Sequence, residues 1–158
     1  MPLPGRTVSA RSRVSVPRVH APRLTLSALE LLQQAHRALA EAADHSHPGD
    51  RYAAAHLAAL RGAAAVLAAR SEPPGTAIRR RPTSAWVLLR SMAPELGEWA
   101  SFFAAGARKR AVAEAGAPDA VSEREADDLV REVGTFLAVV ETTLGLPARP
   151  VLRVARAG

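Results

Sequence analysis

An almost unbroken apolar stripe near the C-terminal end of the chain constrains the fold more than any other sequence feature. Its residues recur at three- and four-residue steps, which places them on one face of a helix. Ser122 and Glu125 have the spacing of a capping box, and Gly145 and Pro147 are suited to end the helix. Such a helix is stable only when its apolar face is packed, so we expect a helical core. The stripe consists of Ala126, Leu129, Val130, Val133, Phe136, Leu137, Val140 and Leu144.

Two helices are predicted in the first half of the chain. The first covers about residues 25–43, with Ser27 and Glu30 spaced as another capping box. The second covers about residues 50–70, and one of its sides is built mainly from small residues, which would allow a neighbouring helix to approach closely. That side comprises Tyr52, Ala55, His56, Ala59, Ala63, Val66 and Leu67.

Two more helices are expected before the C-terminal one. A short helix follows from Thr83 or Ser84 to about Ala93, and Pro94 is suited to the first turn of the next helix, which ends by Gly116. Because the pattern contains no strand alternation, we predict an all-α fold of about five helices. Its core is expected to rest on the large side chains Trp86, Trp99, Phe102, Phe103 and Phe136.

The net charge of +6 is concentrated at the two ends of the chain. Residues 1–23 contain five arginines, four prolines and no acid, and residues 146–158 contain three arginines and no acid. Residues 24–145 have 13 basic and 15 acidic side chains, so this part is slightly acidic. We therefore predict a disordered basic arm (1–23), a helical bundle (24–145) and a disordered basic C-terminal tail (146–158).

Several classes of protein are disfavoured by what the sequence lacks. The absence of cysteine excludes disulfides, thiolate metal sites and a cysteine nucleophile. We find no apolar run of the length that a membrane span needs, and no apolar block typical of a secretory signal near the N-terminus. Phosphate-binding glycine loops and hydrolase or zinc-protease motifs are also missing. We expect a cytoplasmic protein with no membrane partner, no metal and no cofactor.

Three segments carry a resemblance to a known family. They are the run Arg51-Tyr-Ala-Ala-Ala-His56-Leu-Ala-Ala-Leu-Arg61, the run Trp86-Val-Leu-Leu, and the run from Pro94 to Phe103. With the Arg-rich loop between them, residues 25–145 resemble the small Ala/Arg-rich actinobacterial branch of the HEPN superfamily. The resemblance implies an antiparallel up-and-down bundle of four or five helices, often dimeric. Many members are metal-independent ribonucleases with an Arg-x(4–6)-His motif, whereas others bind nucleotides or proteins without catalysis.

The resemblance makes Arg51 and His56 the candidate catalytic pair. A histidine titrating near neutrality can transfer the proton of a 2′-hydroxyl, and an arginine can hold the scissile phosphate. In catalytic members the motif usually lies near the start of the last major helix, whereas here it opens the second. Five helical positions also separate the two residues by about 140° around the helix axis. The alternative is a packed structural histidine beside a solvated arginine.

Two basic triplets are candidate phosphate contacts. Arg79, Arg80 and Arg81 lie in the loop after the second helix, and Arg108, Lys109 and Arg110 lie on the fourth. If they converge they would form a basic patch; otherwise each is a solvated loop or helix end.

Three other groups have both a functional and a structural interpretation. Trp86 and Trp99 would be able to stack bases, although their helical spacing favours core positions. The linker residues Asp44, His45, His47 and Asp50 would make only a weak metal site, and a solvated turn is the favoured interpretation. Asp127 and Asp128 suit the N-terminus of a helix better than a carboxylate dyad, because adjacent residues point about 100° apart.

The leading hypothesis is a non-catalytic HEPN-like bundle that binds RNA, a nucleotide or a protein partner. We expect it to form a homodimer through the small-residue side of the second helix. One alternative is a metal-independent endoribonuclease that uses Arg51 and His56. The other is a scaffold or regulatory protein without a nucleic-acid role, which would fit the acidic balance of residues 24–145.

Overall fold

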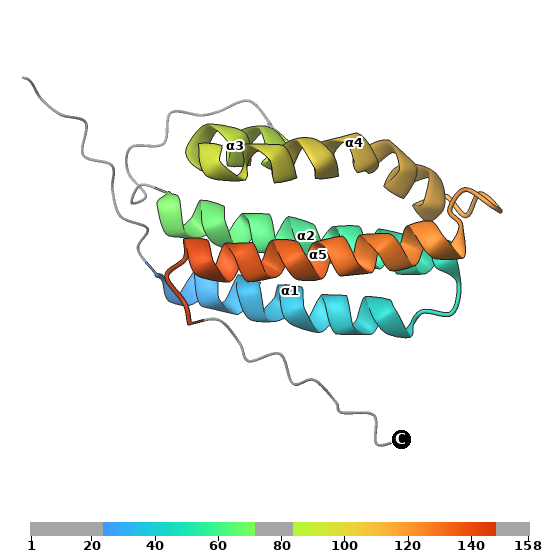
Figure 1. Cartoon of the computed structure of the whole chain (residues 1–158), viewed down its shortest axis with the longest axis horizontal. Helices are drawn as coiled ribbons and strands as arrows, with labels where there is room; N and C mark the ends of the chain where they lie inside the picture. The colour runs from blue at the N-terminus through green and yellow to red at the C-terminus, as the bar shows by residue number, and fades with distance from the viewer. Residues whose placement is uncertain (1–23, 72–83, 148–158) are drawn as a thin grey trace, which may run out of the picture.

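The computed structural model describes residues 24–71 and 84–147, and every regular element within these ranges is helical. The long helices run alternately up and down, and a short helix precedes the third of them (Figure 1), which confirms the predicted all-α bundle. The predicted arm (1–23), the Arg79–Arg81 loop and most of the predicted tail (148–158) lie outside the described residues. The elements are α1 (Leu26–Asp44), α2 (Pro48–Arg70), α3 (Ala85–Met92), the 3₁₀ turn η1 (Pro94–Leu96), α4 (Gly97–Glu114) and α5 (Glu123–Thr143).

Helix α2 is the centre of the bundle, and α1, α3, α4 and α5 all pack against it (Figure 1). This packing is possible because the buried side chains of α2 are mostly small, so that the neighbouring backbones come close. Its small buried residues are Gly49, Ala55, Ala58, Ala59, Gly62, Ala63, Ala65 and Ala69. The predicted dimer seam on this helix is therefore already occupied by helices of the same chain.

The central position of α2 also explains why this helix is rich in apolar residues. Contrary to the expectation from the sequence, one of the described helices, α2, is long and apolar enough to cross a membrane by length and composition alone. Most of its alanines are buried against the other helices of the bundle, although Leu57 is 39% exposed. A central core helix needs such a composition, so α2 is a core helix.

Hydroxyl side chains cap the N-termini of both α1 and α5. The capping box of Ser122 and Glu125 is present, with both reciprocal hydrogen bonds formed. At α1 the predicted Ser27–Glu30 box is wrong, because the N-cap is Thr25, whose hydroxyl accepts a hydrogen bond from the Ala28 amide at 3.1 Å. Either residue type is a good cap, and the capping hydroxyl lies two residues earlier than predicted.

Proline shifts two further boundaries from their predicted positions. Helix α2 begins at Pro48, two residues before the predicted start, because proline fits the first helical turn. Pro94 opens a 3₁₀ turn, and α4 proper begins only at Gly97. At the end of α5, Gly145 has a φ of 73°, as expected of a residue that terminates a helix.

Four aromatic residues form the large part of the core, as predicted. The rings of Trp86 and Phe103 stack with centroids 5.0 Å apart, and Phe136 lies 5.0 Å from Phe103. Trp99 covers this cluster from α4. The prediction was wrong for Phe102, which is 47% exposed. Adjacent helical residues point about 100° apart, so Phe102 and Phe103 do not both face the core.

Gly62 provides a test of the close packing around α2. A Cβ atom at this position would lie 2.5 Å from Leu137 Cδ2 on α5. We expect Gly62→Ala to destabilise the fold by about 1–3 kcal/mol through overpacking. The matched control is Gly134→Ala on α5, where a Cβ would meet Leu39 Cδ2 at an ordinary 3.8 Å. The control should gain about 0.5–1 kcal/mol of helix propensity. Urea unfolding measures both, and equal effects would contradict the packing argument.

Candidate functional site

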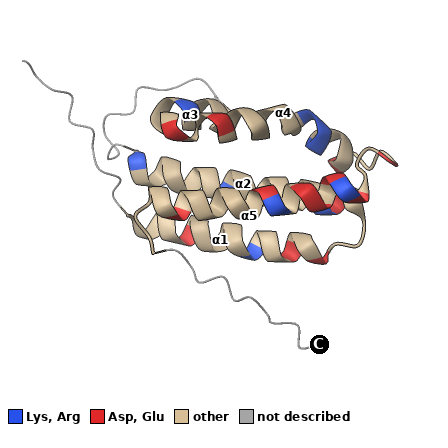
Figure 2. Cartoon of the chain, in the orientation of Figure 1, with Lys and Arg blue, Asp and Glu red and all other residues tan. Residues whose placement is uncertain are grey.

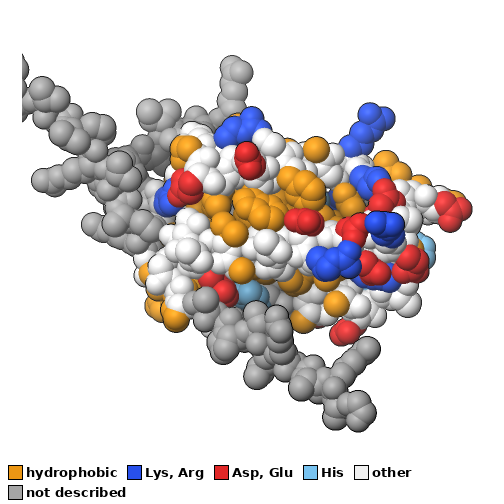
Figure 3. Space-filling view, viewed as in Figure 1, with side chains coloured by type: hydrophobic (Ala, Val, Ile, Leu, Met, Phe, Trp, Pro, Cys, Tyr) orange, Lys and Arg blue, Asp and Glu red, His pale blue; other side chains and the backbone are white. Residues whose placement is uncertain are grey.

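An open groove lies between α4 and α5, with α2 as its floor (Figure 3). Both helices pack on α2 but make at most a marginal contact with each other. The groove contains two adjoining hollows of about 480 and 300 Å³. They share Tyr52, Phe102, Lys109 and Leu129. Apolar and charged side chains meet in these two hollows, so we take the groove as the candidate site.

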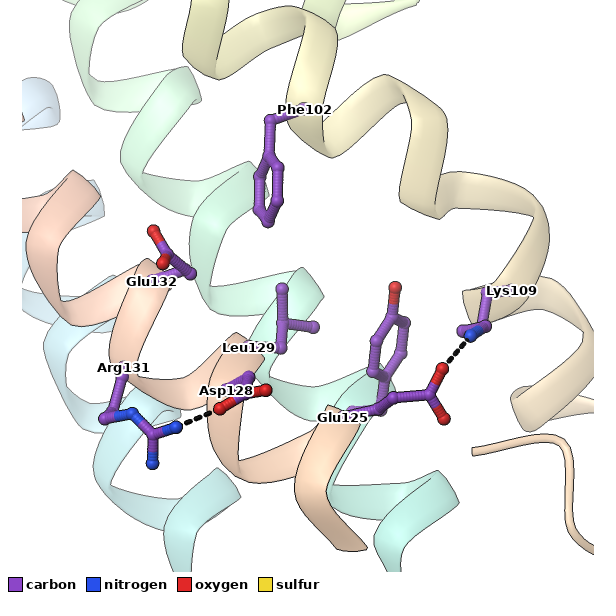
Figure 4. Close-up of a pocket in the computed structure, with 8 residues that line it drawn as sticks. Phe102, Lys109, Glu125, Asp128, Leu129, Arg131 and Glu132 are labelled. Carbon is purple, nitrogen blue, oxygen red and sulfur yellow. Dashed lines mark hydrogen bonds and ion pairs between the residues drawn. The ribbon is translucent and has the colours of Figure 1, made fainter. Parts of the chain in front are cut away.

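Apolar groups line the middle of the groove. Phe102 extends from α4 toward Leu129 of α5 (Figure 4). The ring of Phe102 packs edge-on against Phe103, with centroids 5.1 Å apart, and Leu129 is buried beneath. Figure 3 shows hydrophobic side chains gathered between the two helices, with charged groups on either side. The groove therefore presents an aromatic ring on a supported apolar base.

A phenol hydroxyl approaches the backbone of α4 at the floor of the groove. Tyr52 is buried, and a Cβ atom at Gly106 would lie only 3.0 Å from its hydroxyl oxygen. A side chain at Gly106 would therefore require the Tyr52 hydroxyl to move by a few tenths of an ångström. Burial raises the pKa of Tyr52, and the nearby charge of Lys109 lowers it in part. The floor of the groove consequently carries a neutral hydroxyl group at physiological pH.

Charged residues form the rim, and most of them are already paired. Lys109 binds Glu125 across the groove, and Arg131 binds Asp128 on α5 (Figure 4). Hydrogen bonds from Lys109 and from the Ser122 amide hold the pKa of Glu125 at about 2. Glu132 has no ion-pair partner among the described residues. With three acids and two bases, the rim is slightly acidic.

His56 lies beneath this groove and is only 1% exposed. Its Nε2 donates a hydrogen bond to the carbonyl oxygen of Phe103 at 2.9 Å, which fixes the proton on that nitrogen. The ring meets Trp86 and Phe103 edge-on. Its Nδ1 has no hydrogen-bond partner among the described residues. Burial lowers the pKa of His56 below its ordinary value of 6.5, and the Phe103 hydrogen bond offsets this in part. The imidazole is therefore a neutral, enclosed group.

Arg51 extends in a different direction, toward the start of α5. Its two terminal nitrogens donate to Glu123 Oε2 at 2.9 and 2.8 Å, and its Nε lies 3.6 Å from Asp127 Oδ1. The side chain is 11% exposed. The structure thus places Arg51 against α5 and His56 against α3 and α4, and it does not bring the predicted catalytic pair together.

The basic triplets do not form a described patch. Arg79, Arg80 and Arg81 lie outside the described residues. On α4, Lys109 binds Glu125 and Arg110 donates to Glu114 at 2.9 Å, while Arg108 is exposed. Two of the three cations on α4 are therefore neutralised by neighbouring carboxylates.

The other predicted candidates have structural environments. Trp86 is buried, so its ring is not available to stack on a base. His47 Nδ1 lies 3.9 Å from Asp50 Oδ2 in an exposed turn, and the described residues contain no group of three or more side chains suited to a metal. Asp127 contacts Arg51, and Asp128 contacts Arg131.

One partly buried polar pair was not predicted from the sequence. His36 Nε2 on α1 lies 2.7 Å from Glu141 Oε1 on α5, and Glu141 is 5% exposed. The partners are 105 residues apart in the sequence. The one available signal was the position of Glu141 four residues after Leu137, which places it on the buried stripe. The pair links the first and last helices.

Burial of the neutral His56 ring has a consequence for stability. The pKa of His56 is lower in the folded chain than in the unfolded chain, so the unfolded chain binds more protons below about pH 6.5. The free energy of unfolding therefore decreases as the pH falls through that value. In His56→Gln, an amide can still donate to Phe103 but does not titrate. Urea unfolding at pH 8 to 5 should show a steeper loss for the natural chain than for the variant. Parallel pH profiles would contradict the enclosed neutral state.

Comparison with known proteins identifies a family. No curated protein and no solved structure matches the chain significantly. The sequence profile of the SAV_6107-like HEPN family matches residues 40–141, which extend from the end of α1 almost to the end of α5. The helical bundle described above agrees with this assignment, because HEPN is a helical fold. The chain therefore belongs to the SAV_6107-like HEPN family.

Proposed function

We propose that this chain is a non-catalytic HEPN module that binds a segment of a protein partner in the groove between α4 and α5. The observation that carries the proposal is the half-exposed Phe102 above the buried Leu129, inside a concave surface. Aromatic anchors at a concave apolar site are typical of protein-binding hot spots. The partly paired rim charges would serve as the polar border that such interfaces have.

Electrostatics favour a protein over RNA as the ligand of this groove. The described residues carry 14 acidic and 10 basic side chains, and the rim has three acids to two bases. Figure 2 shows the acidic and basic groups interspersed along the groove half of α5. Binding RNA requires a surplus of cations facing its phosphates. The excess of acidic side chains therefore supports a protein ligand and not a nucleic acid.

The surroundings of Arg51 and His56 support the absence of catalysis. A general base has to reach the proton that it removes and needs a pKa close to the working pH. His56 is enclosed, its pKa is lowered, and its Nε2 proton is held by Phe103. Arg51 is engaged by two carboxylates of α5. His56 thus links α2 to α4, and Arg51 links α2 to α5, which are structural roles.

We place the protein in the cytoplasm, which agrees with its lack of cysteine and with the central position of α2 in the bundle. A homodimer, which the family resemblance implies, would need a surface other than the small-residue side of α2. That side already contacts helices of its own chain.

Ribonuclease assays test the absence of catalysis. The purified chain should not cleave single-stranded RNA in EDTA beyond the background of a double variant, Arg51→Ala with His56→Gln. Circular dichroism verifies that the variants keep their helices. RNA cleavage that each single substitution abolishes, without loss of helicity, would show that the enzyme interpretation is correct.

Site-specific crosslinking tests the groove. A photoreactive benzoylphenylalanine at Phe102 should capture a discrete protein in cells, whereas the same group at Val87, which is 58% exposed on α3, should not. A peptide synthesised from the crosslinked segment should bind the purified chain, and Phe102→Ala should weaken this binding by about tenfold or more, as loss of a hot spot does. An affinity unchanged by Phe102→Ala would contradict the proposal.

A further inference from the structure

We propose that the N-terminal arm of the same chain, residues 1–23, docks in the groove between α4 and α5 and competes there with a partner. The inference uses the groove of the proposed function as its site but does not require any particular partner. It pairs the strongly basic arm with the slightly acidic rim of the groove.

Charge complementarity is the first argument. The arm contains five arginines and no acid. The described bundle has four more acids than bases. On the groove rim, Lys109 and Arg131 are each bound to a carboxylate, while Glu132 has no ion-pair partner among the described residues. An incoming arginine would therefore meet an available carboxylate and little opposing free cation.

The pattern of the arm matches the groove in a second way. In an extended chain, alternate side chains point to opposite sides. In the run Arg11-Ser-Arg-Val-Ser-Val16 this alternation places Arg11 and Arg13 on one side and Val14 and Val16 on the other. A segment with an apolar side and a cationic side fits a groove whose base is Phe102 and Leu129 and whose rim is acidic.

The length of the arm and its point of attachment allow this contact. The arm ends at residue 23, and α1 begins soon after, at Leu26, beside the C-terminal end of α5 (Figure 1). From Thr143 back to Leu129, α5 extends about 21 Å at about 1.5 Å per residue. An extended chain covers about 3.3 Å per residue, so about seven residues bridge that distance. The run from Arg11 to Val16 is therefore within reach of the groove in the same molecule.

A spin label on the arm tests the contact in the full-length chain. Because the protein has no cysteine, Ser9→Cys provides a single attachment site. The nitroxide should broaden the amide NMR signals of Phe102, Leu129 and Glu132 far more than that of Val87. Replacing Arg11 and Arg13 with Glu, or adding about 0.5 M salt, should abolish the difference. The control label is Ala157→Cys in the C-terminal tail.

Each alternative outcome overturns the inference. Equal broadening at the groove and at Val87 would mean that the arm has no preferred site. Stronger groove broadening from Ala157→Cys would assign the groove to the C-terminal segment. Broadening that persists when spin-labelled and isotope-labelled molecules are separate chains in a mixture would assign it to the arm of a second copy. If the spin label shows no preference for the groove but crosslinking at Phe102 captures a partner, the arm contact is wrong and the proposed function still holds.

Discussion

The packing of four helices around α2 is the constraint on which the rest of the structure depends. Its alanines and Gly62 let the neighbouring backbones approach so closely that a single added carbon on Gly62 would meet Leu137 at 2.5 Å. Because α4 and α5 each pack on this helix and hardly on one another, a groove remains between them. The same arrangement encloses His56 and places Tyr52 on the groove floor. Core packing and the candidate site thus have one origin.

The fate of the Arg51–His56 pair shows why a motif and a site are different things. A spacing of five residues is recognisable in sequence, yet on a helix it directs the two side chains about 140° apart. One neighbour, α5, supplies carboxylates for the arginine, and another, α4, supplies a carbonyl for the histidine. Membership of the HEPN family agrees with the helical fold of the chain. The contacts of Arg51 and His56, by contrast, support a structural role for both residues.

Charge is divided between two parts of this protein. The described bundle has more acids than bases, and the remaining segments hold 11 of the 21 basic residues with a single acid. An overall charge of +6 would by itself indicate a nucleic-acid ligand. When the charge is assigned to segments, the acidic bundle favours a protein ligand. The positive charge of the arm complements the acidic rim of the groove. The same division links the proposed partner site with its proposed regulation.

The sequence by itself determined the five helices, the Ser122–Glu125 cap and the aromatic cluster of Trp86, Phe103 and Phe136, because periodicity and capping depend on residues a few positions apart. It also supplied the family resemblance. Only the tertiary structure decided that Phe102 is exposed, that α4 and α5 leave a groove, and that His36 meets Glu141 across 105 residues. The physical reason is that a local pattern defines the faces of a helix, whereas which face is covered depends on helices distant in the sequence.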